Sequence, residues 1–246
     1  MCRMIAAPLG LPGDCLVDPF LRMAQGRNTL NEVNTMFGKI THGDGWGAVC
    51  GQEGELTVRR STCACWEDES IKELRDRRIF LLHARRQSSG HVVLEDTHPF
   101  EAGVDGARWL FCHNGTVNED LPAPATPTEG TTDSERLFHL LLPYLRDDRA
   151  LEGFRAVYGG IRRFTSLNTF LLGPDALWAV GLCTQNPTYY TLALTETEDG
   201  PIVSSEALPE LPGRQAPLPS GTILRIDRRT GAIKPNVLGE ATLSTR

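Results

Sequence analysis

The chain has 246 residues and a mass of 27.1 kDa, enough for one large domain or two small ones with a sizeable core. Apolar residues make up 40% and charged residues 23%, which excludes wholesale disorder, and no apolar run reaches the length of a membrane span. The net charge of −6 and the pI near 5.6 argue against a general nucleic-acid-binding protein, because they leave no broad basic surface for phosphates.

The start of the chain and its cysteines indicate a cytoplasmic location. The first residues, MCRMIAAPLGLPGDC, lack the basic start and long apolar stretch of a signal peptide. An odd count of seven cysteines without such a signal predicts reduced thiols. Cys63 and Cys65 are one residue closer than the C-x-x-C spacing of zinc and redox sites, so ordinary loop thiols are favoured over a metal site there.

Short runs rich in β-branched, aromatic and aliphatic residues dominate the chain, and several are apolar almost throughout, as strands covered on both faces are. In chain order, the predicted strands are residues 2–7, 46–50, 55–60, 78–85, 108–114, 168–173, 176–182, 188–194, 201–205 and 222–227. Two stretches rich in proline, glycine and threonine, at 122–132 and 209–221, predict long surface loops.

Helical patterns are scarcer, at 18–25, 66–77 and 134–147. Thr132 and Glu135 are spaced as a capping box before the third. Strands in runs with a few separate helices indicate an α+β fold, and the strands are too many for one small sheet. We therefore expect two sheets packed face to face with helices outside, and a single domain over residues 1–246.

Cys2 is the first candidate for chemistry. Initiator methionine is commonly removed before a small residue, and the mature chain would then begin at Cys2 with a free α-amino group. The ordinary pKa of that amine, about 7.7–8.0, leaves part of it unprotonated at neutral pH. It could therefore take the thiol proton and activate the sulfur as a nucleophile.

Polar clusters follow several of the strand-like runs, where small-molecule sites are usually built. They read HGDGWGAV at 42–49, HARRQSSGHVVLEDTHPF at 83–100, CHNGTVNE at 112–119 and TTDSE at 131–135. Several motifs occur in an order and spacing that resemble the class II glutamine amidotransferases. They are the start MCR, the HxR of His83 and Arg85, THPF, HNG and TDSE. Most of the chain shares this resemblance, including SLNTFLLGPDALWAVG and IVSSEAL, which look like the stand-alone members.

The resemblance implies a four-layer αββα sandwich of the Ntn-hydrolase type, with two antiparallel sheets, and an N-terminal nucleophile. Cys2 would attack the side-chain amide carbon of glutamine, form a γ-glutamyl thioester and release ammonia, and water would hydrolyse the thioester. The Asn114 side chain and the Gly115 backbone N–H would hold the oxyanion. The Asn-Gly pair also predicts a tight hairpin turn, which could itself present the Gly115 N–H.

The same resemblance implies a set of substrate contacts. Arg85 would bind the α-carboxylate of glutamine, with Arg86 as the competing candidate, and Asp133 would bind the α-ammonium unless it only caps the following helix. Ser88 would supply a hydroxyl that assists binding. His98 would orient the site, unless it is only structural. Trp46 and Gly47 would form a loop beside the site, and the alternative for Trp46 is a core anchor.

No cofactor or metal is implied, and neither a membrane nor a nucleic acid is an expected partner. The expected substrate is glutamine or a larger γ-glutamyl amide, and a separate synthase could use the ammonia. Two other classes remain open. One is a glutamine-binding or sensing module without turnover, and the other is a metal- or redox-responsive protein built on the cysteines.

Overall fold

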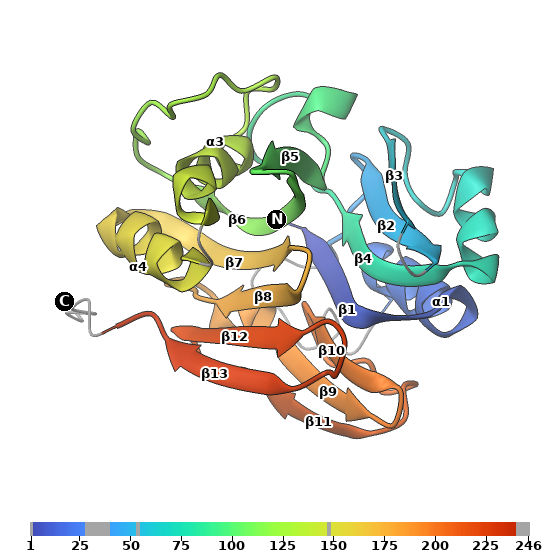
Figure 1. The fold of residues 1–246 in the computed structure, drawn as a ribbon. Coiled ribbons are helices and arrows are strands. Elements are labelled where there is room, and N and C mark those ends of the chain that lie inside the picture. Colours follow the sequence, from blue (N-terminus) through green and yellow to red (C-terminus); the bar gives the residue numbers. More distant parts are fainter. Residues whose placement is uncertain (1, 28–39, 53–54, 147–148, 240–246) are drawn as a thin grey trace.

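The computed structural model of the chain describes residues 2–27, 40–52, 55–146 and 149–239. Two antiparallel β-sheets pack face to face, and helices lie on the outer faces of the pair (Figure 1). This arrangement confirms the α+β class and the αββα layering that the sequence predicted.

The first sheet has seven strands in the order β11-β9-β10-β1-β4-β2-β3. Strand β1 is in the middle, where β10 and β4 pair with its two edges in antiparallel register. The strands are β1 (Arg3–Pro12), β2 (Trp46–Gln52), β3 (Glu55–Ser61), β4 (Arg78–Ala84), β9 (Ala193–Thr197), β10 (Gly200–Ser204) and β11 (Arg214–Pro217).

The second sheet has six strands in the order β13-β12-β8-β7-β6-β5. Its longest strand is β6, which pairs with β7 along most of its length. The strands are β5 (Phe100–Val104), β6 (Ala107–Val117), β7 (Phe164–Leu172), β8 (Ala176–Gly181), β12 (Thr222–Asp227) and β13 (Ile233–Val237).

Each sheet has its own helical cover. Helix α1 (Gly13–Ala24) and the 3₁₀ helix η1 (Glu69–Asp76) share a core with the outer face of the first sheet. Helices α3 (Asp133–Leu141) and α4 (Ala150–Gly160) do the same for the second sheet. The short elements are η2 (Leu94–Asp96), η3 (Leu142–Tyr144) and α5 (Pro187–Tyr190).

The side chains of β1 alternate between two cores. Ile5 and Ala7 pack toward α1, whereas Met4 and Ala6 lie between the sheets with Leu110 and Phe170 of the second sheet. Because successive side chains of a strand point to opposite faces, Cys2 shares the face of Met4. The nucleophile candidate is therefore placed at one end of the layer between the sheets.

Several elements differ from the sequence prediction. Helix α4 and strands β5, β11 and β13 were not predicted, and β11 lies within the expected loop 209–221. The expected strand at 188–194 is instead the end of α5 followed by β9. The helix expected at 66–77 is the 3₁₀ helix η1. Among the described residues, no helix is long and apolar enough to span a membrane.

Candidate active site

The start of β1 meets the end of β6 at one end of the sandwich. The Cys2 side chain is only 6% exposed, and the Cys2 backbone N–H donates a 2.6 Å hydrogen bond to Asn114 Oδ1. The pairing of Met4 with His83 also places the end of β4 beside Cys2. The Cys2 thiol lies 4.0 Å from the carbonyl oxygen of Arg86. Residues from both sheets thus surround the sulfur.

The surroundings of Cys2 favour a thiolate. Burial raises the pKa of the Cys2 thiol. The positive amino terminus, His83 and the Arg86 backbone lower it by more than burial raises it, so the pKa falls from 9.0 to about 6. By contrast, burial first and then the charge of Cys2 raise the pKa of the neighbouring Cys112 thiol well above 9.0. Since the thiolate is the nucleophilic form, the site selects Cys2 over Cys112 at neutral pH.

Asn114 has one satisfied and one free side-chain atom. Its side chain is fully buried, and while Oδ1 accepts the Cys2 N–H, the Nδ2 group has no hydrogen-bond partner within the described part of the chain. A buried amide donor without a partner costs stability and is uncommon in native proteins. The Cys2 bond fixes which end of the amide is the donor, so Nδ2 is available to an oxygen beside the sulfur.

Asn114 and Gly115 lie in the extended strand β6, so the hairpin-turn alternative for this pair is wrong. Gly115 faces Leu167 of β7, and a Cβ atom on it would come within 1.8 Å of the Ser166 carbonyl oxygen. The glycine is therefore required by the close approach of β7. The pairing becomes irregular between Gly115 and Val117, at the end of β6 where the candidate site lies.

Arg85 is only 3% exposed and anchors the loop that follows β4. Its Nη1 donates to the carbonyl oxygen of His91 at 2.7 Å, and its Nη2 donates to that of Ser89 at 3.0 Å. Each of these nitrogens carries two N–H bonds, so one on each remains for a substrate carboxylate. Arg86 lines a hollow together with Asp44 and Glu67.

Asp133 is the first residue of α3, but its carboxylate does not cap the helix. Thr132 is the N-cap, and its hydroxyl accepts the Glu135 N–H at 3.2 Å. Asp133 Oδ1 accepts the Ser89 hydroxyl at 2.7 Å, and Oδ2 accepts the Val117 N–H at 2.7 Å. The carboxylate therefore joins the Arg85 loop to the end of β6, and the capping alternative for Asp133 is wrong.

The predicted hydroxyl, Ser88, is at the same junction. Ser88 is exposed, and its Oγ accepts a 3.0 Å hydrogen bond from the hydroxyl of Thr116, the residue after Gly115. Asp44 closes the other side of the loop, where its Oδ2 accepts the Gln87 N–H at 2.8 Å. The loop is thus held on both sides by polar contacts.

Three buried histidines lie close to one another near Cys2: His83, His98 and His113. The His98 and His83 rings are in contact, with centroids 4.1 Å apart and a tilt of 31° between their planes. His83 acts on the Cys2 thiol through charge and a hydrogen bond. Burial, followed by the charges of His83, His113 and Arg85, holds the pKa of His98 well below 6.5, so that its ring is neutral. His98 touches the site through His83, a residue that we named in the HxR motif but did not assign to the site from the sequence. The HxR spacing could have indicated it, because in an extended chain residues two apart point to the same side, and His83 is at the end of β4 with Arg85 just after it.

The two neighbours Trp46 and Gly47 point to opposite faces of β2. Trp46 is in the core under α1, and its indole N–H donates to Asp68 Oδ2 at 3.0 Å. This placement favours the core-anchor alternative over a substrate contact. Gly47 faces the other way, where a Cβ atom would come within 2.0 Å of the His98 carbonyl oxygen. Its small size lets the His98–Pro99 segment cross the strand.

The cysteines form no disulfides, and no group of three or more metal-binding side chains occurs in residues 2–27, 40–52, 55–146 and 149–239. Cys63 is exposed and Cys65 is buried, and burial raises the pKa of the Cys65 thiol to about 12. The two thiols are not exposed together, and the Cys65 thiol lacks the thiolate character of a metal ligand or redox cysteine.

The model of the family described as glutamine amidotransferases class-II matches residues 33–164, which is more than half of the chain. The chain belongs to the class-II glutamine amidotransferase family. The family match includes Arg85, Asn114 and Asp133 and begins after Cys2. It therefore agrees with the resemblance that the motifs carried.

Two curated proteins and a solved structure show how far the similarity extends. A Haemophilus influenzae protein and an Escherichia coli protein, each named "putative glutamine amidotransferase", are 26% and 30% identical over 60% and 41% of this chain. The chain spans about half the length of these relatives, 54% and 42% respectively. A structure of an allosteric regulatory enzyme of purine biosynthesis superposes on 97% of this chain and 49% of its own with a TM-score of 0.68 and 15% identity, which establishes the shared fold.

Proposed function

We propose that the chain cleaves the side-chain amide of glutamine, or of a larger γ-glutamyl amide, with Cys2 as the nucleophile. The observation that carries the proposal is the Cys2–Asn114 pair, in which one amide atom holds the Cys2 nitrogen and the other is a buried donor without a partner. A lowered thiol pKa and a preorganised oxyanion donor beside it are what acyl transfer from an amide needs.

The proposed reaction has two steps. The Cys2 thiolate attacks the amide carbon, the carbonyl oxygen becomes an oxyanion, and Asn114 Nδ2 and the Gly115 N–H donate to it. The α-ammonium of a mature Cys2 gives a proton to the leaving nitrogen, and ammonia or an amine departs from the thioester. The freed α-amine then takes a proton from water, the resulting hydroxide attacks the thioester carbon, and glutamate and the Cys2 thiolate are released.

Removal of Met1 would strengthen this arrangement. The positive amino terminus already lowers the pKa of the Cys2 thiol. In a chain that begins at Cys2, that charge would be on the nitrogen of the same residue, and its effect would grow because the charges are closer. The Asn114 Oδ1 contact would then hold the amine in place.

We propose that Arg85 and Asp133 bind the two charged ends of the substrate amino acid. The geometry supports this because Ser89 joins them: its carbonyl oxygen accepts from Arg85 and its hydroxyl donates to Asp133. A guanidinium and a carboxylate held by one loop suit the α-carboxylate and α-ammonium of one glutamine. Ser88 would add a hydroxyl at the edge of the same site.

We expect Arg85→Ala and Asp133→Asn mainly to raise the KM for glutamine. Losing a charge-assisted contact should lower kcat/KM by roughly 30- to 150-fold. Steady-state ammonia release measures this, with Asp120→Asn, an exposed carboxylate, as the control. If Arg86→Ala shows the loss while Arg85→Ala behaves as the wild type, Arg86 and not Arg85 binds the carboxylate.

We expect kcat/KM to fall in acid with a midpoint at or below the Cys2 thiol pKa of about 6, because the amino charge is closer to the sulfur once Met1 is removed. Below that pH the sulfur is protonated and uncharged, so the rate should drop by about tenfold per pH unit. Because His83 lowers this pKa, His83→Gln should move the midpoint to higher pH. A pH–rate profile measures both, and the control is His139→Gln on α3, where His139 contacts Thr126 rather than Cys2. An unmoved midpoint in His83→Gln would exclude His83 as the group that tunes the thiol.

We propose that residues 1–246 act as a single glutaminase domain in the cytoplasm. The ammonia or amine would be released or passed to a separate synthase. Neither the two-step reaction above nor the binding of substrate by Arg85 and Asp133 requires a metal or another cofactor. A glutamine-sensing module would share these binding residues but would not need a thiol whose pKa is about 6. Turnover of glutamine by the purified chain separates the two functions.

A further inference from the structure

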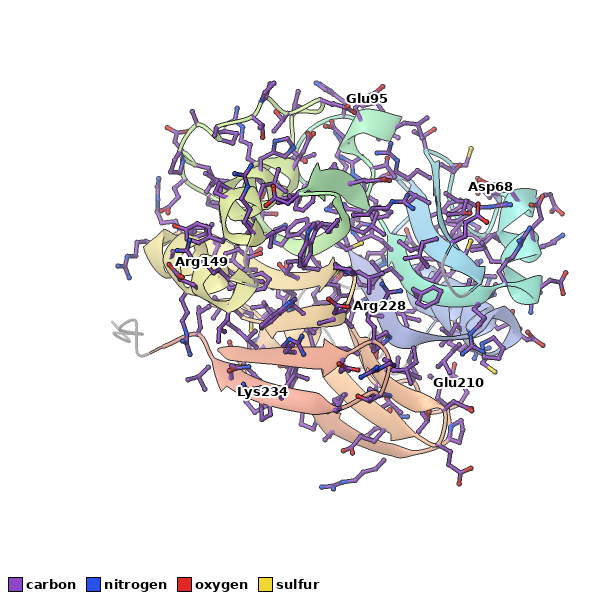
Figure 2. The ribbon with its side chains drawn as sticks, viewed as in Figure 1. Asp68, Glu95, Arg149, Glu210, Arg228 and Lys234 are labelled. Carbon is purple, nitrogen blue, oxygen red and sulfur yellow. The ribbon has the colours of Figure 1, made fainter. Side chains whose placement is uncertain are left out.

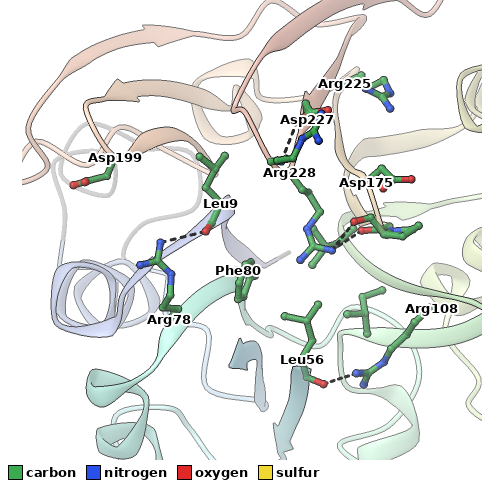
Figure 3. A pocket seen from close by; sticks show the side chains of 15 residues that line it. Leu9, Leu56, Arg78, Phe80, Arg108, Asp175, Asp199, Arg225, Asp227 and Arg228 are labelled. Carbon is green, nitrogen blue, oxygen red and sulfur yellow. Dashed lines mark hydrogen bonds between the residues drawn. The ribbon is translucent and has the colours of Figure 1, made fainter. Parts of the chain in front are cut away.

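A hollow of about 960 Å³ opens at the other end of the sandwich from Cys2 (Figure 3). It lies between the sheets, where β4 and β6 begin and where the β7–β8 turn and the end of β12 come together. Arg108 at its edge is six residues before Asn114 on β6, so the two sites are roughly 20 Å apart. We call it the far-end hollow, and its volume is within the range of small-molecule sites.

Arg228 follows the end of β12 (Figure 2), and its side chain extends toward Phe80 of the first sheet (Figure 3). Its Nη1 donates to the carbonyl oxygens of Gly173 at 2.8 Å and Pro174 at 3.1 Å, whereas its buried Nε has no partner in the described part of the chain. Burial lowers the pKa of this guanidinium, and the charge of Asp175 partly offsets that decrease. Arg228 is thus a fixed cation, partly removed from water, with an unused donor.

Arg78 approaches the hollow from the first sheet. Its Nη2 donates to the carbonyl oxygens of Leu9 and Gly10 at the end of β1. No carboxylate of the described residues lies within ion-pair distance of Arg78 or Arg228, although Asp175 acts on Arg228 through its charge. Backbone carbonyls fix the two guanidinium groups in position without neutralising them.

The walls between these cations are apolar. The Arg228 guanidinium lies over the Phe80 ring, 5.4 Å from its centroid, and Leu9, Leu56 and Leu110 line the same space. Five arginines and three aspartates line the hollow. One of the arginines, Arg108, is ion-paired with Glu101, and one of the aspartates, Asp227, is occupied by the N–H groups and the hydroxyl of the turn that follows β12, which leaves four arginines and two aspartates. The excess of arginines over aspartates around the hollow favours an anion as the ligand.

We propose that the far-end hollow binds an organic anion that joins a carboxylate, sulfonate or phosphate head to an apolar body. The head would contact Arg228 and Arg78, and it would give the Arg228 Nε a partner. The body would lie against Phe80 and the leucines. Fixed guanidinium groups suit such oxyanions because their N–H groups are directed in a rigid fork. This inference is independent of the proposed glutaminase activity.

The test uses 8-anilinonaphthalene-1-sulfonate and its neutral analogue N-phenyl-1-naphthylamine, titrated into the folded full chain and followed by fluorescence. We expect saturable binding of the sulfonate, about tenfold or more tighter than the neutral dye, because only the sulfonate can accept from the arginines. Arg228→Met and Arg78→Met should each weaken sulfonate binding by about tenfold or more. Both retain a long apolar side chain.

Arg155→Met is the matched control, since Arg155 also donates to a backbone carbonyl, that of Val237, but lies outside the hollow. Its dye affinity should equal that of the wild type. Thermal unfolding checks each variant, and if Arg228→Met does not fold, Arg78→Met and the comparison of the two dyes still decide the matter. Equal binding of the two dyes, no saturable binding, or unchanged sulfonate affinity in a folded arginine variant would overturn the proposal.

Discussion

Replacing Cys2 with alanine is expected to abolish release of ammonia from glutamine while leaving the fold intact. The sulfur is the only atom lost, and the Cys2 N–H bond to Asn114 comes from the backbone, so it is retained. Alanine at position 2 also still permits removal of Met1, which keeps the amino terminus comparable. The measurements are an ammonia-release assay and thermal unfolding of the two proteins.

Intact-mass analysis with a glutamine-analogue electrophile tests the same prediction directly. The wild type should lack Met1 and gain one adduct, and Cys2→Ala should gain none. Cys63→Ala is the control, because Cys63 is an exposed thiol that should neither carry the adduct nor affect it. An active protein that retains Met1 would rule out the α-amine as the base, and an active Cys2→Ala would rule out the nucleophile.

The sequence predicted which motifs lie together better than it predicted the elements around them. Motifs widely separated along the chain lie together as expected: Cys2 contacts Asn114, and the loop after Arg85 contacts Asp133. The neighbours Trp46 and Gly47 divide between the two faces of β2, because side chains alternate along a strand. The motif alone does not show which of the two residues faces the site, unless the face of the sheet that carries Cys2 is known.

Other errors came from residues whose local preference was overridden by packing. The Asn-Gly pair at 114–115 has the local preference of a turn, but the Ser166 backbone of β7 needs a glycine inside the strand. Helix α4 contains several glycines, which are poor helix formers, and yet it forms because Phe154 and Tyr158 are buried against the second sheet. The edge strands β11 and β13 contain prolines, which tertiary pairing tolerates there.

Loss of the Asn114 donor is the second change with a large expected effect. Negative charge builds on the amide oxygen only as the thiolate attacks, so the Nδ2 contact should matter more in the transition state than in the ground state. Asn114→Ala should lower kcat by roughly 100- to 1000-fold, with a much smaller change in glutamine affinity. The rate comes from steady-state ammonia release, and the affinity comes from calorimetric titration of glutamine into Cys2→Ala with and without the second change.

The alanine variant also removes the acceptor of the Cys2 N–H, so Asn114→Asp is the sharper test. Aspartate keeps an oxygen for the Cys2 nitrogen but removes the Nδ2 donor and repels the oxyanion, and it should therefore be at least as harmful as alanine. Asn118→Asp, which adds a charge at an exposed position just after β6, controls for the charge alone. A sensing module predicts weaker glutamine binding and no turnover to lose. Equal losses of binding and rate would assign Asn114 to the ground state, because an oxyanion donor acts on the rate far more than on the affinity.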